Sequence, residues 1–325
     1  MKSSFEMQHP NSSFDPTPFL APRFWPTWLL IALFRGLVML PWAWQLRLGM
    51  ALGDLSRYLL PRRRRIVETN VAMAFPSLSP GQRRLLVRES MRNSGIAVFE
   101  TMFSWWGDER RLRSMARTEG VEHLHRAWKA GRGVILLGGH FTCMMLCGRM
   151  LALQLPFHIL VKKSRNPLFE ALMHHYRRKH YQGVIDSHDL RAMVRALKEN
   201  RICWYAPDQD FGRKHSVFAP FMGVSTATLT TTARLARLSG APVLPIAYRR
   251  LPGNGGYRIT IHPPLAAFPT GDAVEDATRI NQIVEQQLRE APEQYLWAHR
   301  RFKTRPADEP GPYPPKRARR RSRTR

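Results

Sequence analysis

Short, wholly apolar runs recur along the second half of the chain, separated by longer amphipathic stretches. Runs of this length are typical of strands buried on both faces of a sheet. The runs cover residues 133–138, 157–161, 202–206, 243–248 and, less uniformly, 257–261, and the stretches with helical spacing lie near 142–153, 167–180, 189–199 and 228–239. The glycines of 253–256, before the last run, are typical of a hairpin turn. The pattern predicts an α/β fold, a mixed sheet with helices on both faces.

An apolar segment near the N-terminus, from Phe24 to Leu46, has about the length of a membrane-spanning helix and carries Trp at both ends. Arg35, near its middle, would cost about 2.5–3.5 kcal/mol in the bilayer core. The segment therefore fits a steeply tilted spanning helix, a re-entrant helix or a helix that lies in the plane of the interface. Four arginines, Arg62 to Arg65, follow it, as is typical of the cytoplasmic side. We expect an N-terminal membrane-anchor helix, with the main body in the cytoplasm.

Composition sets the remaining boundaries. Residues 1–18 are polar and rich in Ser and Pro, and residues 307–325 are rich in Pro and Arg, so we expect a disordered N-terminus and a basic disordered tail. Residues 19–50 then form the membrane-anchor segment. We expect residues 51–306 to form one folded domain. Within it, residues from about 80 to 130 have helical periodicity.

The chain is strongly basic. Its 51 Lys and Arg residues against 24 Asp and Glu residues give a net charge of +27, and most of this excess remains without the last ten residues. A polypeptide of this charge binds polyanions or an anionic membrane surface. A nucleic-acid-binding protein is one candidate, but the sequence contains no nucleic-acid-binding motif. We therefore expect an acidic protein or lipid partner and no nucleic acid.

The sequence offers little support for a metal or a nucleotide cofactor. Cys143, Cys147 and Cys203 lack the spacing of a disulfide framework or a zinc site, and neither an HExxH motif nor a Walker loop occurs. We expect reduced thiols, no metal and no cofactor.

Titratable side chains follow two of the predicted strands. The strand at 133–138 runs into Gly139 and His140, where an imidazole could abstract a proton, or could instead be satisfied by backbone. Asp208 and Asp210 follow the strand at 202–206, and an Asx turn would account for one of them. Because ligands bind at the carboxyl ends of strands in such sheets, we expect these groups to share one edge.

Six segments, in their order and spacing, resemble the lipid A late (secondary) acyltransferases of Gram-negative bacteria, the lauroyl/myristoyl transferase family. The segments are MRNSGIAVFETMFSWW, GGHF, NPL with Glu170, WYAPDQDFG, SVFAPFMG and APEQYLWAHRRFKTRP. The resemblance covers roughly residues 20–306. It implies a glycerolipid-acyltransferase-like fold and an enzyme of lipopolysaccharide biosynthesis in the bacterial inner membrane. Such an enzyme transfers a fatty acyl chain from acyl carrier protein to a hydroxyacyl chain of a Kdo-bearing lipid A precursor.

The resemblance also implies roles for individual residues. His140 would be the general base that deprotonates the acceptor hydroxyl. The substrate-binding residues would be Lys162, Arg165, Asn166, Asp210, Arg300 and Arg301. Of these, Lys162 or Arg165 would stabilise the oxyanion, and Arg300 and Arg301 would hold phosphates or carboxylates of the glycolipid, although the run from Trp297 to Lys303 also fits a solvated surface.

Two positions depart from the family's pattern. The family's motif is a histidine, four further residues and then an acid. In this sequence Met145 stands at the position of the acid after His140, and a thioether cannot orient an imidazole. Glu100, Asp208 and Asp210 are the candidates for a replacement acid. Lys162 stands where the family tends to have Arg. The alternative to an active enzyme is a catalytically reduced or inactive paralogue that binds the lipid A precursor.

Overall fold

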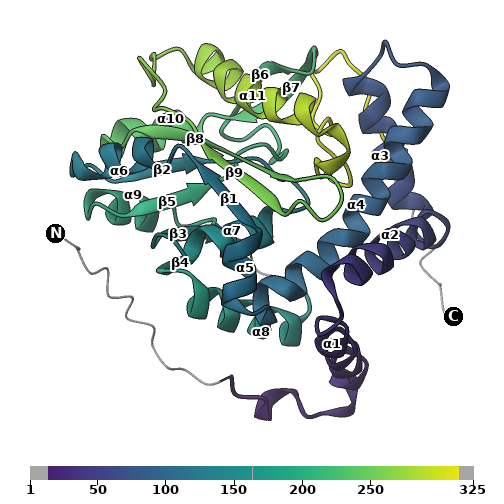
Figure 1. Cartoon of the computed structure of the whole chain (residues 1–325). Coiled ribbons are helices and arrows are strands. Elements are labelled where there is room, and N and C mark those ends of the chain that lie inside the picture. Colours follow the sequence, from purple (N-terminus) through teal and green to yellow (C-terminus); the bar gives the residue numbers. More distant parts are fainter. Residues whose placement is uncertain (1–13, 163, 315–325) are drawn as a thin grey trace, which may run out of the picture.

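The predicted apolar runs form one sheet in the computed structural model, which describes residues 14–162 and 164–314 (Figure 1). The strands are β1 (Ala116–Glu119), β2 (Val134–Leu137), β3 (His158–Val161), β4 (Gly183–Asp186), β5 (Ile202–Tyr205), β6 (Ser216–Phe221), β7 (Val224–Leu229), β8 (Val243–Arg250) and β9 (Tyr257–Ile261). All five predicted strands are confirmed. The sequence reading missed β1, β4 and the separate hairpin of β6 and β7.

The strand order of the main sheet is β1-β9-β8-β2-β5-β3-β4. β2 pairs in parallel with β8 and β5, and β3 pairs in parallel with β5 and β4. β9 is antiparallel to β8, as the glycine-rich turn predicted, and β1 is parallel to β9. The sheet is therefore mixed, as expected. Its parallel part brings the carboxyl ends of β2, β3 and β5 to the same edge.

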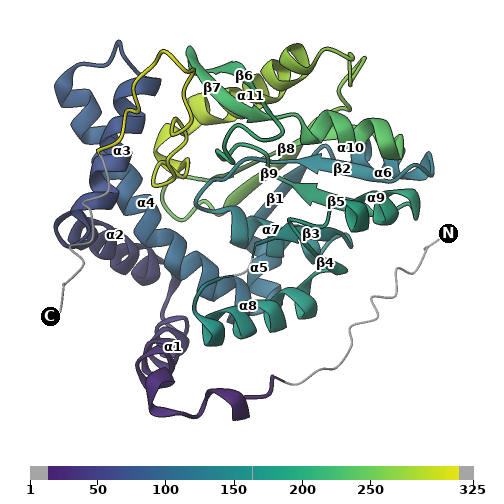
Figure 2. The same cartoon turned by 180° about the vertical axis from the view of Figure 1, so that it is seen from behind.

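Helices cover both faces of the sheet (Figures 1 and 2). They are α1 (Trp25–Leu37), α2 (Trp42–Leu59), α3 (Pro61–Ala74), α4 (Pro80–Trp106), α5 (Glu109–Met115), α6 (Val121–Lys129), α7 (Met144–Ala152), α8 (Pro167–His180), α9 (Leu190–Lys198), α10 (Thr231–Ser239) and α11 (Ala273–Glu290). Short 3-10 turns are η1 (Thr17–Phe19), η2 (Pro22–Phe24) and η3 (Pro292–Gln294). The four predicted helices correspond to α7, α8, α9 and α10.

Successive side chains of β2 point to alternate faces of the sheet and belong to two separate apolar layers of the core. Val134 and Leu136 belong to the apolar cluster that includes side chains of α4, α6 and α7. Ile135 and Leu137 belong to the cluster on the opposite face, with side chains of α9 and α10. Successive side chains of a strand point to opposite faces, so a wholly apolar strand requires cover on both sides.

The apolar N-terminal segment folds as two helices and not as one. α1 ends at Leu37, and α2 begins at Trp42 after Pro41, whose ring favours the start of a new helix and not the continuation of the old one. Within residues 14–162 and 164–314, no helix is both long and apolar enough to cross a bilayer. The predicted boundary at residue 50 falls inside α2.

Glycines bring α2 against α4. A Cβ on Gly49 would lie 2.7 Å from the Cα of Ile96, and a Cβ on Gly95 would lie 2.2 Å from the carbonyl oxygen of Gly49. The two backbones can approach this closely only because both positions lack a side chain. Asp54 adds an ion pair to Arg92 at 2.8 Å. α2 is therefore packed tightly onto the domain.

Parts of the two predicted disordered ends are described. Residues 1–13 and 315–325 lie outside the described residues. Phe14 lies edge-on to Trp28, with ring centroids 6.1 Å apart. Tyr313 accepts a hydrogen bond from the backbone N–H of Phe302 at 3.0 Å and its hydroxyl contacts Asn70. The described portions of both ends thus contact the folded domain.

Candidate active site

A glycine turn leads from β2 to His140. A Cβ on Gly138 would lie 2.8 Å from Trp204 Nε1 and 2.9 Å from Tyr248 Oη, so a side chain here would displace one of the two rings. The Tyr248 hydroxyl donates a hydrogen bond to the carbonyl oxygen of Gly139. The turn is therefore held against the ends of β5 and β8.

His140 and Asp208 form a hydrogen-bonded pair at the edge of the sheet. Asp208 Oδ1 lies 2.5 Å from His140 Nδ1, and Asp208 Oδ2 accepts the backbone N–H of His140 at 2.8 Å. The parallel pairing of β2 with β5 brings the two together across a separation of 68 residues. The exposed fraction of the His140 side chain is 20%, whereas that of Asp208 is 1%. The imidazole is thus fixed at one nitrogen and remains open to solvent.

Electrostatics favour an ionised Asp208. Burial raises the pKa of this carboxyl, but the charge of His140 and the hydrogen bonds from it outweigh burial and hold the pKa at about 2. His299 lies nearby and differs in character, because burial lowers its pKa to about 4. Its Nε2 accepts the backbone N–H of Asp210 at 3.1 Å, which agrees with a neutral ring.

The C-terminal signature holds the glycine turn that carries His140 from the other side. The backbone N–H of Leu296 donates to the carbonyl oxygen of His140 at 2.9 Å. The backbone N–H of Thr142 donates to the carbonyl oxygen of Gln294 at 2.8 Å. Asn70 of α3 in turn donates to the carbonyl oxygens of Trp297 and His299, each at 2.6 Å. The segment 291–306 therefore positions His140 through backbone contacts, a role that its sequence did not reveal.

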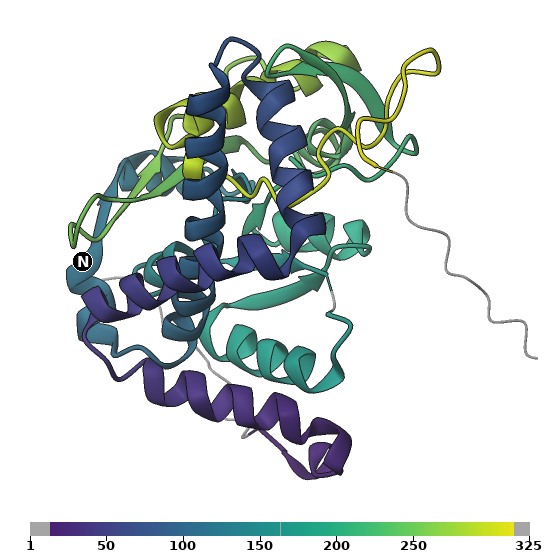
Figure 3. The same ribbon diagram turned by 90° about the vertical axis from the view of Figure 1, so that its right-hand side faces the viewer.

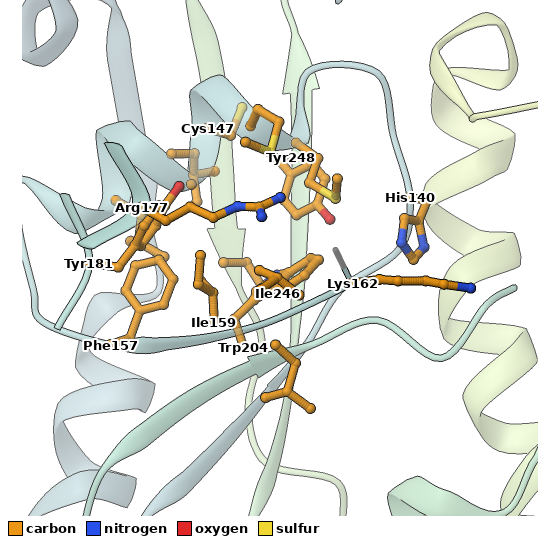
Figure 4. A pocket seen from close by; sticks show the side chains of 17 residues that line it. His140, Cys147, Phe157, Ile159, Lys162, Arg177, Tyr181, Trp204, Ile246 and Tyr248 are labelled. Atoms are coloured by element: carbon orange, nitrogen blue, oxygen red, sulfur yellow. The ribbon is translucent and has the colours of Figure 1, made fainter. Parts of the chain in front are cut away.

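Two cavities meet at His140. The first, the apolar slot, has a volume of about 170 Å³ and extends from His140 and Lys162 past Tyr248 to Arg177, Phe157 and Tyr181 (Figure 4). The second, the cleft, has a volume of about 580 Å³. The cleft is lined by His140, Leu160, Lys162, Ser187, His188, Leu190, Trp204, Tyr205, Ala206, Gln209, Phe211, Lys214, His215, Leu229 and Thr231.

Met145 lines the apolar slot. Because Asp208 already occupies the Nδ1 side of the imidazole, the ring has an orienting carboxylate without an acid at position 145. Of the three replacement acids predicted from the sequence, the structure brings Asp208 to His140.

Glu100 lies elsewhere, in a buried polar network. Its Oε1 accepts hydrogen bonds from Arg250 and from the Tyr257 hydroxyl, each at 2.7 Å. Burial opposes the charge of Arg250, but the Glu100 carboxylate raises the arginine's pKa above its ordinary value. The hydrogen bonds of Glu100 in the described residues go to this network and not to His140. Glu100, one of the three candidates for the replacement acid, therefore makes no hydrogen bond to His140 in the described structure.

Of the two predicted oxyanion-stabilising cations, Lys162 and Arg165, only Lys162 lines the cavities beside His140. Lys162 is exposed and lines both cavities beside His140. Arg165 is also exposed but lines neither of them. Asn166 caps α8, because its side chain accepts the N–H of Phe169 at 3.1 Å, and it also donates to Thr27 of α1 at 3.2 Å. Asn166 thus has a structural role here.

Asp210 and the paired arginines of the signature are engaged within the protein. Asp210 accepts the hydroxyl of Thr304 at 2.9 Å and lies 3.4 Å from Lys303. Arg301 is only 1% exposed and donates to the carbonyl oxygen of Ala227 at 2.9 Å. The substrate contact predicted for Arg301 does not fit this burial. Arg300 is half-buried, with its guanidinium 5.4 Å from the centre of the Tyr313 ring.

Sequence reasoning missed three polar residues at the site: Tyr248, His299 and Arg177. Tyr248 ends a run identified only as a strand, and His299 lies within a signature noted for its cations. Arg177 lies on α8 in the run YRRK, which is typical of a solvated helix face. Its guanidinium instead points across the slot toward Tyr248, and burial lowers its pKa (Figure 4).

The site combines a histidine oriented by a buried carboxylate with an apolar slot and a cleft that both reach its ring. Such a site suits proton transfer beside a bound apolar chain, and the class of protein that it fits is an acyltransferase.

The comparison with known proteins gives the family. Residues 13–304 match the family described as bacterial lipid A biosynthesis acyltransferase. The chain belongs to this family and acts in lipid A biosynthesis.

Three relatives from Escherichia coli strain K12 are similar along nearly their whole length. A lipid A biosynthesis lauroyltransferase is 38% identical over 298 residues, covering 91% of this chain and 97% of that protein. A lipid A biosynthesis palmitoleoyltransferase is 38% identical over 296 residues, covering 91% and 96%. A lipid A biosynthesis myristoyltransferase is 26% identical over 326 residues, covering 95% and 97%.

Proposed function

We propose that this acyltransferase moves a fatty acyl chain from acyl carrier protein to a hydroxyacyl chain of a Kdo-bearing lipid A precursor, with His140 as general base. The observation that carries the proposal is the His140–Asp208 pair at the junction of the apolar slot and the cleft. Asp208 holds Nδ1, which leaves Nε2 as the nitrogen that can accept a proton from the acceptor hydroxyl.

The transfer balances with two partners and no further reagent. His140 takes the proton as the acceptor oxygen attacks the thioester carbonyl, and Lys162 stabilises the negative oxygen of the tetrahedral intermediate. The carbon–sulfur bond then breaks, and the leaving thiolate takes the proton back from the imidazolium. Asp208 stabilises the imidazolium between the two steps.

The slot suits the acyl chain of the donor, and the cleft suits the polar groups of the substrates near the thioester. The slot is walled by apolar side chains, including Phe157, Ile159 and Ile246, which suits an acyl chain. The cleft carries Lys162, Lys214 and three histidines, which suits phosphate or carboxylate groups near the reacting atoms. The orienting acid supplied by Asp208 favours an active enzyme over an inactive paralogue.

The N-terminal helices would bring this site to the membrane. α1 and α2 lie next to each other on one side of the molecule (Figure 3). Large apolar side chains are exposed on and beside them: Trp25, Leu29, Leu30, Leu33, Met39, Trp44, Leu48, Leu55, Tyr58, Leu59 and Leu60. An exposed apolar surface beside the basic run Arg62 to Arg65 fits an interfacial contact with anionic lipid. We place the enzyme at the cytoplasmic face of the bacterial inner membrane.

The test measures formation of the acylated product from the proposed donor and acceptor. Membranes that contain the protein, supplied with acyl carrier protein thioester and the lipid A precursor, should yield a product heavier by one acyl chain, detected by mass spectrometry. His140→Ala should abolish this product. Unchanged turnover by the His140→Ala variant would refute the assignment of the base, and no product from the unaltered protein would refute the proposed reaction.

A further inference from the structure

A third cavity, the helix groove, lies between α9 and α10. Its volume is about 310 Å³. Leu190, Val194, Leu235 and Leu238 give it apolar walls, and Arg191, Arg195, Lys198 and Arg234 surround them with positive charge. No Asp or Glu is among the residues that line it.

The charges of the groove are exposed and arranged in a row. Arg191, Arg195 and Lys198 recur at spacings of four and three residues, which places them on one side of α9. The opposite side of α9 carries Met193 and Leu197 and is buried against the sheet. Within residues 14–162 and 164–314, neither these three side chains nor Arg234 forms a salt bridge. The groove therefore presents four cations without a carboxylate partner in the described protein.

The groove adjoins the candidate active site. Leu190 and Thr231, the first residues of α9 and α10, line both the groove and the cleft. The cleft in turn shares His140, Lys162 and Trp204 with the apolar slot. The groove, the cleft and the slot are therefore neighbouring cavities, in this order from the outer surface at α9 and α10 to the far side of His140.

The position of the groove separates it from the apolar N-terminal helices. In Figures 1 and 2, α9 and α10 lie at the end of the sheet away from α1 and α2. A partner bound here would not compete for the surface that α1 and α2 offer to lipid. Rows of cations around apolar walls suit an acidic, amphipathic helix of a protein partner.

We propose that the helix groove is the docking surface for the acidic carrier protein that delivers the acyl thioester, an inference that rests on the proposed function. An acidic helix of the carrier pairs with Arg191, Arg195, Lys198 and Arg234. The carrier's prosthetic arm passes through the cleft to place the thioester at His140, and the acyl chain enters the slot. Charge complementarity at the groove accelerates encounter and selects the carrier-bound donor over a free thioester.

The test compares two donors with the same acyl group: the acyl carrier protein thioester and the small thioester of pantetheine. The double variant Arg191→Glu/Arg195→Glu should raise KM for the carrier-bound donor by about tenfold or more. It should leave turnover of the pantetheine thioester unchanged, because both side chains lie outside the cleft. Arg234→Glu, on the opposite wall, should act in the same direction.

A matched control removes the same charge elsewhere. Arg110 and Arg113 are exposed on α5, so Arg110→Glu/Arg113→Glu changes the net charge equally and should leave KM for the carrier-bound donor unchanged. An unchanged KM in the groove variants, or an equal rise in the control, would overturn the docking surface. If the groove variants lost binding to anionic phospholipid vesicles while their KM for the carrier-bound donor stayed unchanged, the groove would be a membrane contact and the docking surface would also be overturned. If the unaltered protein uses neither donor, the proposed function itself fails.

Discussion

Asp208 holds His140 at two points, accepting its backbone N–H with one oxygen at 2.8 Å and lying 2.5 Å from the ring Nδ1 with the other. A single carboxylate thereby fixes both the position of the turn and the rotation of the imidazole. A ring held in this way requires no additional acid on α7 to select its tautomer.

Asp208→Asn should lower kcat by roughly 10²- to 10⁴-fold, because the amide cannot stabilise the imidazolium and can hold the ring in the wrong tautomer. Acyl transfer from carrier-bound thioester measures the loss, and thermal unfolding at neutral pH verifies that the variant is folded. An activity within threefold of the unaltered protein would exclude Asp208 as the orienting acid.

Met145→Leu should retain kcat within about threefold, since the side chain lines the slot and an apolar replacement of similar volume is usually tolerated. The same transfer assay is used. A loss comparable to that of Asp208→Asn would mean that Met145 has a role beyond its contribution to the wall.

Gly148→Val should shift donor preference toward shorter acyl chains. A Cβ at position 148 would lie 2.9 Å from the Tyr181 hydroxyl, so a branched side chain narrows the slot near that end. The ratio of kcat/KM for a short and a long acyl donor should change by about tenfold. An unaltered ratio with normal folding would show that the chain does not reach Gly148.

The pKa of Asp208 predicts an acid-dependent loss of stability. The folded value of about 2 lies below the value of about 3.9 for an unfolded Asp, so the ionised group stabilises the fold above pH 4. This contribution, about 2 kcal/mol, is lost as the pH falls from 4 toward 2. Unfolding midpoints measured from pH 6 to pH 3 should fall less steeply in Asp208→Asn than in the unaltered protein. Parallel curves would contradict the depressed pKa.

Gly95→Ala should destabilise the protein by about 1–3 kcal/mol, because its Cβ would lie 2.2 Å from the backbone oxygen of Gly49 and force α2 away from α4. Gly36→Ala on α1 is the matched control, since nothing lies within 4 Å of its Cβ position. The free energy of unfolding should fall in the first variant only. An equal rise in both would mean that the higher helix propensity of Ala, and not the contact of α2 with α4, decides the outcome.

Much of the fold follows from the apolar pattern, and its exceptions have physical causes. Each strand predicted from the sequence is buried on at least one face, so its composition reveals it. β1 reads ARTE, with exposed residues at alternate positions, and carries too little apolar character to be recognised. β4, at the other edge, reads GVID and is only partly buried. Edge strands owe their form to a neighbour's hydrogen bonds, which the local sequence does not encode.

The site was predictable only in part, for a similar reason. The placement of His140 and Asp208 on one edge follows from parallel strand order, and the structure agrees. The choice among Glu100, Asp208 and Asp210 depends on contacts across the sheet that spacing along the chain does not give. Arg301 was misjudged because arginine is seldom fully buried, and its burial depends on acceptors such as the carbonyl oxygen of Ala227.

The hydrogen bond from Tyr248 to Gly139 ties a wall of the slot to the turn that carries the imidazole. In the proposed mechanism, a fatty chain that displaces Tyr248 would also displace the carbonyl beside His140, so chain binding and proton transfer would depend on the same contact. Acyl-chain preference and turnover should consequently change together among related enzymes whose sequences differ around Tyr248. A lineage that changes one will need compensating changes around this tyrosine to preserve the other.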